Sequence, residues 1–200
     1  MPSAPLRCLS LSAQAGASAF ALLLGLARFE APLLARACAC IDETGILAPD
    51  ELVALNERAI AARETAEMRA ESLQMGHSLG RWLQAVCPDP GQDDWIAQHL
   101  HPLSLPVAWA LAARRMALAT DEAVLSWLWS FAENQVAVLM KAMPMGQMTA
   151  QRLLRGLWPE LLRAREIALQ TEPALWSSAL PLLAVASSRH EIQYSRLFRS

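Results

Sequence analysis

Two pairs of side chains in this sequence could bind a metal ion. His99 and His101 stand one residue apart, so their imidazoles would share a face on a strand and point apart on a helix. Cys38 and Cys40 have the same spacing and could bind a soft or borderline metal as thiolates. Neither pair has a further ligand at the spacing typical of a zinc site. We interpret the histidines as exposed turn residues and the cysteines as buried, reduced thiols, and we predict no bound metal or cofactor.

Three glutamates, Glu64, Glu67 and Glu71, recur on one predicted helix at the spacing i, i+3, i+7. Arginines are interleaved with them, which favours a solvated or partner-binding face over a carboxylate pair for acid–base catalysis. The sequence has no Gly-x-Ser-x-Gly elbow, no HExxH helix and no Walker A loop, and it lacks a glycine-rich segment that would hold a phosphate. We therefore do not expect this chain to hydrolyse nucleotides itself.

The C-terminal residues 188–200 combine arginines with aromatic and aliphatic side chains. Solvated tails usually lack such anchors, whereas arginine and aromatic residues are typical of the energetic centres of protein interfaces. A forked guanidinium also binds carboxylates and backbone carbonyls. Composition alone leaves two interpretations open, docking on a partner or packing on the chain's own domain. The residues concerned are Arg189, Tyr194, Arg196, Leu197, Phe198 and Arg199.

Composition limits the kind of fold that can position these residues. Of 200 residues, 54% are hydrophobic and 18% are charged, which excludes intrinsic disorder. The formal net charge of -2 argues against a broad nucleic-acid-binding face. Apolar residues recur at helical spacing almost throughout. We predict an all-α, single-domain helical bundle with a charged C-terminal tail, and helices over residues 13–40, 49–83, 93–100, 107–118, 120–143, 147–170 and 173–186. We expect a kink or break at Pro32, a break or bend around Pro159, and Pro181 inside the last helix.

The N-terminal residues raise a separate question. Between Arg7 and Arg28 no residue is charged, and this length would just span a bilayer. Polar residues dilute its first half, and only residues 20–26 are strongly apolar. A signal peptide is an alternative, but its cleavage site would lie far beyond the apolar core, so we favour a buried helix. We expect a cytoplasmic protein that contacts neither membrane nor nucleic acid.

Three segments resemble the UreF family of urease accessory proteins, in the same order and spacing. Residues 181–200, PLLAVASSRHEIQYSRLFRS, are similar to the C-terminus of that family. Residues 62–69, ARETAEMR, resemble its RET-E-R helix, and residues 141–147, KAMPMGQ, resemble its lysine-to-glutamine segment around a proline and a glycine. The resemblance covers about residues 29–200. Residues 1–28 do not reproduce the family's Pro-Val-Gly-x-Tyr-x-x-Ser-x-Gly-Leu-Glu motif.

The resemblance implies an all-α homodimer that is not an enzyme. UreF proteins sit between the urease-binding accessory protein UreD, also called UreH, and the nickel-carrying GTPase UreG. Their complex loads nickel into apo-urease, so the implied function is that of a chaperone and adaptor. The alternative is a truncated or divergent helical interaction module that lacks full assembly function. The expected parts are an atypical apolar segment over residues 1–28, a UreF-like helical domain over 29–186 and a partner-binding tail over 187–200.

We expect partner contacts in the three matching segments. Lys141, the only lysine, could offer a point charge to the GTPase or pair with the C-terminal dipole of its own helix. The tail would become ordered on UreD and help to recruit the GTPase. The candidate partner-binding residues are Glu64, Arg69, Lys141, Arg189, His190, Glu191, Gln193, Tyr194, Arg196, Leu197, Phe198 and Arg199.

Overall fold

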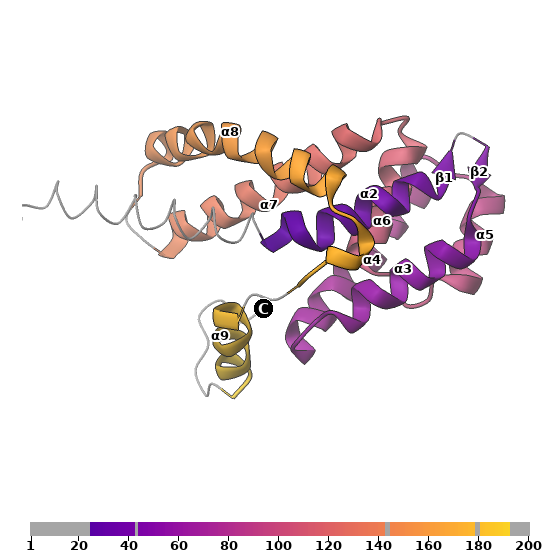
Figure 1. The fold of residues 1–200 in the computed structure, drawn as a ribbon, viewed down its shortest axis with the longest axis horizontal. Helices are drawn as coiled ribbons and strands as arrows, with labels where there is room; N and C mark the ends of the chain where they lie inside the picture. The colour runs from indigo at the N-terminus through magenta and orange to yellow at the C-terminus, as the bar shows by residue number, and fades with distance from the viewer. Residues whose placement is uncertain (1–24, 43, 143–144, 179–180, 193–200) are drawn as a thin grey trace, which may run out of the picture. The chain divides into compact units, whose positions relative to one another are not determined.

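The computed structural model describes residues 25–42, 44–142, 145–178 and 181–192 (Figure 1). Regular structure in these residues is almost entirely helical, and the only strands among them form one short hairpin. The predicted all-α fold class is therefore confirmed. Among the described helices, none is both long and apolar enough to cross a membrane. Most of the uncharged N-terminal run, together with residues 13–24 of the first predicted helix, lies outside the described residues.

The chain forms two compact units, and each unit combines two separate stretches of sequence. Unit 1 contains the described residues from 25 to 35 and from 121 to 177, and unit 2 contains those from 36 to 120 and from 178 to 192. The described chain therefore passes from unit 1 to unit 2, back to unit 1, and returns to unit 2 for the last of the described helices. The domain boundaries expected at residues 28 and 186 stay a prediction.

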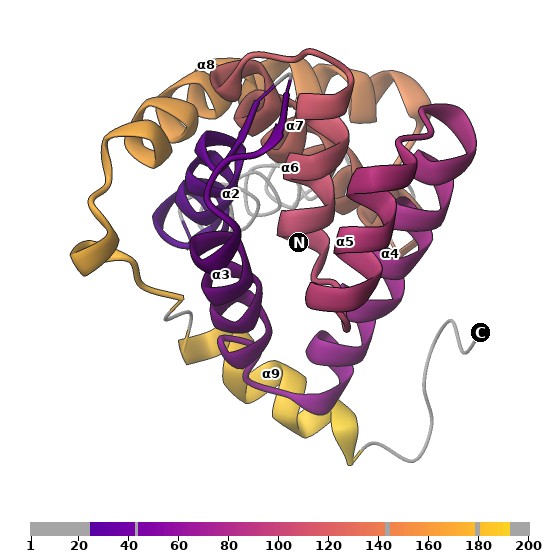
Figure 2. The same cartoon turned by 90° about the vertical axis from the view of Figure 1, so that its right-hand side faces the viewer.

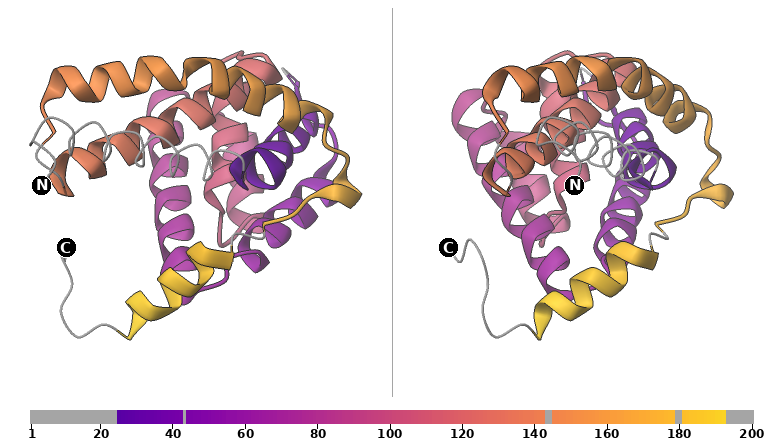
Figure 3. Two further views of the ribbon diagram at one scale, coloured as in Figure 1. Left: turned by 60° about the vertical axis from the view of Figure 1, so that its left-hand side comes forward. Right: turned by 90° about the vertical axis from the view of Figure 1, so that its left-hand side faces the viewer.

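Unit 1 is built on two long helices that lie side by side (Figures 1 and 3). Trp129 of the first packs edge-on against Trp158 of the second, with ring centroids 5.8 Å apart. At the other end of the unit, Phe29 lies edge to face with Trp176 at 6.5 Å, which ties the residues after the second long helix to the start of α2. The elements concerned are α2 (Glu30–Ala39), whose first residues belong to this unit, α7 (Thr120–Ala142), α8 (Gln147–Gln170) and the 3-10 turn η1 (Pro173–Leu175).

Unit 2 places a short hairpin before four helices and receives one more helix from the end of the chain. Its elements are β1 (Ile41–Asp42), β2 (Gly45–Ile46), α3 (Pro49–Ala61), α4 (Ala66–Val86), α5 (Pro90–His99), α6 (Leu105–Arg115) and α9 (Pro181–Glu191). The two strands are antiparallel, with Ile41 opposite Ile46 and Asp42 opposite Gly45. Gly45 has a φ of +133°, a conformation that suits glycine alone. Helices α4 and α6 lie side by side (Figure 2).

The close packing of α4 on the start of α6 defines the core of unit 2. A Cβ atom added at Gly76 would lie 2.3 Å from the backbone oxygen of Leu103, so only glycine allows this approach. The buried side chain of Asn56 holds the same loop from the side of α3. It donates to the carbonyl oxygen of Pro102 at 2.9 Å and accepts from the backbone N–H of Ser104 at 2.9 Å.

One predicted helix is two helices in the structure. The sequence predicts a single helix over residues 49–83, but α3 ends at Ala61 and α4 begins at Ala66. Thr65 stabilises the start of the second helix, because it adopts an extended conformation and its hydroxyl accepts a hydrogen bond from the backbone N–H of Met68 at 3.3 Å. This N-cap satisfies one of the amides that a new helix start leaves without a partner.

A break does occur near Pro32: residues 25–28 are helical, a turn at Phe29 interrupts the helix, and Pro32 lies in the first turn of α2, where its missing N–H costs no hydrogen bond. The helix is not broken at Pro159, and the expectation that Pro181 lies inside the last helix was wrong. Helix α8 continues through Pro159, which lies on the exposed side, so solvent can reach the carbonyl that loses its amide donor. The helix predicted over residues 173–186 is replaced by η1 and α9, because Pro181 occupies the first turn of α9, where its fixed φ favours a helix start.

Candidate functional site

The end of α9 lies against the start of α4 (Figure 3), and we call this contact the α4–α9 junction. The hydroxyl oxygens of Thr65 and Ser187 are 2.9 Å apart. The backbone N–H of Glu67 donates to Oε1 of Glu191 at 3.2 Å, and Nδ1 of His190 lies 2.8 Å from Oε2 of Glu67. These three contacts join residues that are 122 to 124 positions apart in the sequence.

The electrostatics of a helix end explain why α9 binds at this point. The first amides of a helix have no partner inside it and carry a partial positive charge. Thr65, which is 4% exposed, satisfies one of these amides in α4, and the carboxylate of Glu191 takes the N–H of Glu67. The contact between His190 and Glu67 is half exposed and contributes only about 0–1 kcal/mol. The junction therefore depends mainly on the helix N-terminus and on the buried threonine.

The junction brings together two of the three segments on which the resemblance rests. Glu64 and Arg69 are exposed on either side of Glu67, and Arg189 is exposed near the end of α9. Helix α9 continues past residue 187, so the first residues of the expected tail are helical. The remaining tail candidates lie outside the described residues: Gln193, Tyr194, Arg196, Leu197, Phe198 and Arg199.

The third segment lies in unit 1, at the end of α7. Lys141 stands in the last turn of that helix, is exposed, and makes no hydrogen bond or ion pair with another described residue. Arg152 and Arg155, in the first half of α8, are exposed and equally unpaired within the described part of the chain. No acidic residue occurs in the sequence between Glu133 and Glu160. This stretch of unit 1 is therefore cationic in a chain of slightly negative net charge.

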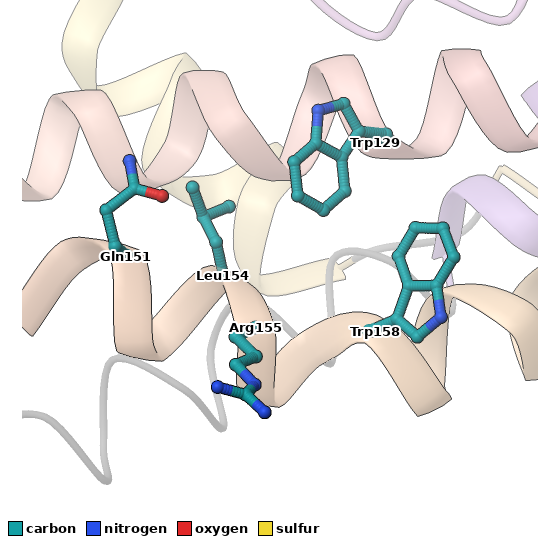
Figure 4. A pocket seen from close by; sticks show the side chains of 5 residues that line it. All are labelled: Trp129, Gln151, Leu154, Arg155 and Trp158. Atoms are coloured by element: carbon teal, nitrogen blue, oxygen red, sulfur yellow. The ribbon is translucent and has the colours of Figure 1, made fainter.

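An open pocket of about 290 Å³ lies between the side chains of α7 and α8 in the same unit (Figure 4). The indole rings of Trp129 and Trp158 form one end of it, and Leu154 lies between them and the polar end. Gln151 and Arg155 complete the lining. Such a lining suits an apolar side chain with a neighbouring carboxylate.

The residues considered as metal ligands are not brought together. Within the described residues, no group of three or more His, Cys, Asp or Glu side chains is placed to hold a metal ion. His99 stacks on Trp95 at 4.7 Å, and its Nδ1 lies 2.9 Å from the backbone oxygen of that residue. Cys38 and Cys40 are buried, and burial raises the pKa of Cys38 to about 12 and that of Cys40 to about 11. Both thiols are protonated at neutral pH, which disfavours metal binding.

Two residues of the α4–α9 junction were absent from the sequence prediction. Thr65 carries a local signal, because a threonine two residues before a glutamate is typical of a helix N-terminus. Ser187 carries none, since its contact depends on a chain return of more than a hundred residues. The sequence predicted the partners of this junction as separate motifs and did not predict that they touch.

Comparison with known proteins agrees with the sequence resemblance. The family model described as UreF matches residues 13–157, so the match includes part of the N-terminal segment and ends before the C-terminal residues. A urease accessory protein UreF of Ectopseudomonas mendocina is 47% identical over 180 residues, covering 90% of this chain and 79% of that protein. A protein of the same name from Pseudomonas aeruginosa is 50% identical over 182 residues, covering 90% of this chain and 78% of that protein.

A third relative, from Azotobacter vinelandii, carries the same name and is 46% identical over 179 residues, covering 90% of this chain and 79% of that protein. Identity at this level over nine-tenths of the chain, together with the family-model match, is decisive. The chain belongs to the UreF family of urease accessory proteins.

Proposed function

We propose that this protein is a non-enzymatic chaperone and adaptor in urease maturation. It bridges the accessory protein UreD and the GTPase UreG in the cytoplasm, as a homodimer, while their complex inserts nickel into apo-urease. Nickel is the cargo of that complex. Family membership supports a role in urease maturation, and the bridging role is the finer step that we propose.

The α4–α9 junction is the observation that carries the proposal. The junction fixes the helix from which the arginine–aromatic tail continues, so the tail starts from a defined place on unit 2. A short segment with a fixed base loses less entropy on binding than a free peptide does. Its arginines can make forked hydrogen bonds to partner carboxylates, while its aromatic side chains become buried. We assign this tail to UreD.

A different surface serves the GTPase in this proposal. Lys141 is exposed at the end of α7 and is not engaged by another described residue, so its charge is available to a partner. The neighbouring residues of α8 add two arginines without an acidic residue to neutralise them. A cationic surface favours an acidic partner and speeds its association. We assign this surface to UreG.

Co-purification tests the tail assignment. The full chain is expressed with its cognate UreD and UreG and compared with a chain that ends at Ile192. This end point keeps α9 and the α4–α9 junction, whereas a chain ending at Ser187 would cut the helix and remove Glu191 from its contact. Co-elution of UreD with the full chain and its loss from the shortened chain are the expected results. Equal binding of UreD by both chains would refute the tail assignment.

Matched point variants separate the two partners. Lys141→Ala should weaken recovery of UreG at least several-fold and leave UreD bound, whereas Arg163→Ala, which removes another exposed cation of unit 1, should change neither. Failure of the well-folded full chain to bind either partner would contradict the adaptor proposal. It would favour a helical interaction module without full assembly function.

A further inference from the structure

The pocket between α7 and α8 contains aromatic surface that the packing of unit 1 does not cover. Its volume is about 290 Å³, and two tryptophans, a leucine, a glutamine and an arginine line it. Trp158 remains 43% exposed, although its ring packs edge-on against that of Trp129. A large aromatic side chain that borders an open pocket and stays in contact with water is typical of a binding surface.

The size and the two ends of the pocket limit what can enter it. A cavity of about 150 Å³ holds a benzene molecule, so this pocket has room for one aromatic side chain. The two indole rings meet at 72° with centroids 5.8 Å apart, and a third ring can join them in the same edge-to-face manner. Gln151 lies about 10 Å along α8 from Trp158, and its amide can bind the backbone of an entering segment.

The basic residues of this surface favour an acidic occupant. Arg155 belongs to the lining, and its guanidinium points away from the two indole rings (Figure 4). It is exposed and makes no hydrogen bond or ion pair with another described residue. The same holds for Arg152 and Lys141 within the described part of the chain. These charges are therefore available to carboxylates of a partner.

The acidic residues near the pocket do not cancel this charge. Glu133 lies one turn of α7 from Trp129 and is not part of the lining. On α8, Oε2 of Glu160 is 3.4 Å from Nη1 of Arg163, so that carboxylate already has a cationic neighbour. Residues 133–159 contain three basic side chains and one acidic side chain, which leaves the surface positive.

We propose that the pocket receives one aromatic side chain from an acidic segment of the protein that docks on this surface, which the proposed function takes to be UreG. The inference rests on that assignment and names the group that the surface recognises. The entering ring lies against the two indoles, and a carboxylate close to it in sequence accepts forked hydrogen bonds from Arg155. Tryptophan and arginine in a pocket are also the usual energetic centre of a protein interface.

Charge argues against the chain's own C-terminal tail as the occupant. Residues 187–200 include aromatic side chains, but they carry three arginines and only one glutamate. Arg152 and Arg155 would repel such a segment, whether it came from the same chain or from a second copy. An acidic segment of a different protein is therefore the occupant that fits both the apolar and the charged part of the pocket.

Co-purification of UreG with the full chain gives the first test. Trp158→Ala and Arg155→Glu should each lower the recovery of UreG at least fivefold and leave UreD bound. Their matched controls are Trp82→Ala and Arg81→Glu, which change a tryptophan 44% exposed and an exposed arginine on α4, in unit 2, and should leave UreG bound. Glu133→Gln should raise the recovery about twofold, because it removes the acidic side chain nearest the pocket on α7.

Two results of this experiment would overturn the proposal. One is equal recovery of UreG by the parent chain and by both pocket variants, with circular dichroism spectra like that of the parent. The other is equal loss of UreG in the pocket variants and in their α4 controls, since that would show an effect unrelated to the pocket. Arg155→Glu keeps the test valid if loss of the Trp158 ring disturbs folding, because the Arg155 side chain is exposed and contributes no internal contact.

A peptide probe tests the chemistry of the occupant without UreG. The probe is the blocked pentapeptide Asp-Glu-Phe-Asp-Glu with a fluorine on its phenylalanine ring, and its fluorine NMR signal should broaden when the full chain is added. An analogue with Asn and Gln in place of the acidic residues should broaden several-fold less, as should the acidic probe mixed with the Trp158→Ala chain. Equal broadening of the two peptides would overturn the proposal. Several-fold stronger binding to a chain that ends at Ile192 would also overturn it, because the tail would then be the occupant.

The possible failures of the two proposals are distinguishable. A parent chain that recovers UreD but no UreG refutes the assignment of UreG in the proposed function and this inference with it. If UreG binds the parent chain and the pocket variants equally, while Lys141→Ala loses it, the pocket proposal is overturned and the adaptor function stands.

Discussion

Replacing Gly76 with alanine tests the packing on which α4 and its contacts depend. The added Cβ atom would lie 2.3 Å from the backbone oxygen of Leu103 and 2.8 Å from the backbone carbon of Ser104. Ordinary contacts begin at 3.4 Å, so α4 and the start of α6 must separate by about 1 Å. Backbone atoms cannot rotate away as a side-chain end can. The variant therefore strains the interface throughout its length.

The expected loss follows from two opposing terms. Overpacking a close interface costs about 3 kcal/mol, at the upper end of its usual range, because the obstructing atoms are backbone. Alanine regains about 1 kcal/mol over glycine inside a helix. The net loss is about 2 kcal/mol, which lowers the urea midpoint by about 1 M at an m-value of about 2 kcal/mol/M. Urea unfolding followed by helical circular dichroism measures it.

Two other glycines serve as controls for this substitution. A Cβ atom at Gly80 would meet only the side-chain end of Leu103 at 3.3 Å, and one at Gly156 would meet nothing within 4 Å. Gly80→Ala should therefore be close to neutral, and Gly156→Ala should gain about 1 kcal/mol from helix propensity. If Gly76→Ala is as stable as Gly80→Ala, the close approach of α4 to α6 is not what limits residue 76, and the reasoning is refuted.

Three further outcomes are expected. The pKa values of Cys38 and Cys40 are raised mainly by burial, so the unfolded chain releases thiol protons at a lower pH than the folded chain. The free energy of unfolding should therefore stay level up to about pH 9 and fall as the pH rises through 11 to 12. A variant with both cysteines replaced by alanine should lose that slope in urea titrations. Asn56→Ala should cost about 2–4 kcal/mol in thermal or urea unfolding, because it leaves two backbone groups of the loop before α6 without their partner, and a loss below 1 kcal/mol would contradict this account. Arg115→Ala should cost about 3 kcal/mol, since its guanidinium lies 2.8 Å from Oδ1 of Asp93 with both side chains largely buried; an equally stable variant would show that the pair does not hold α5 to α6.

The sequence predicted helices well where apolar periodicity and end signals agree. Helix α7 begins at Thr120 with acidic residues in its first turn, and α8 spans the predicted 147–170. Where the prediction failed, a single residue had more than one permitted role. Proline breaks a helix in its interior and starts one at its first turn, so Pro159 and Pro181 could not be assigned without knowing which side faces solvent.

The candidate site, like the fold, could be predicted from the sequence only in part. The three family-like segments could be found from residue order alone, and two of them touch in the structure. That contact joins residues more than 120 positions apart, and no local pattern specifies such a return. The exposure of Met75, Trp82 and Val86 could not be predicted, because apolar periodicity alone does not show that Ser72, Gly76 and Leu83 occupy the buried face of α4.

The α4–α9 junction also has a consequence for the order in which the protein is made. Helix α4 is translated early, then all of α7 and α8, and only then α9, the last of the described helices. Domains begin to fold during synthesis, N-terminal parts first, so the start of α4 emerges long before its partner helix exists. The backbone N–H of Glu67 cannot donate to the Glu191 carboxylate until Glu191 has been synthesised. A chain whose synthesis stops within α8 therefore contains neither α9 nor the tail. Partners that recognise the tail would bind only chains whose translation has passed α9.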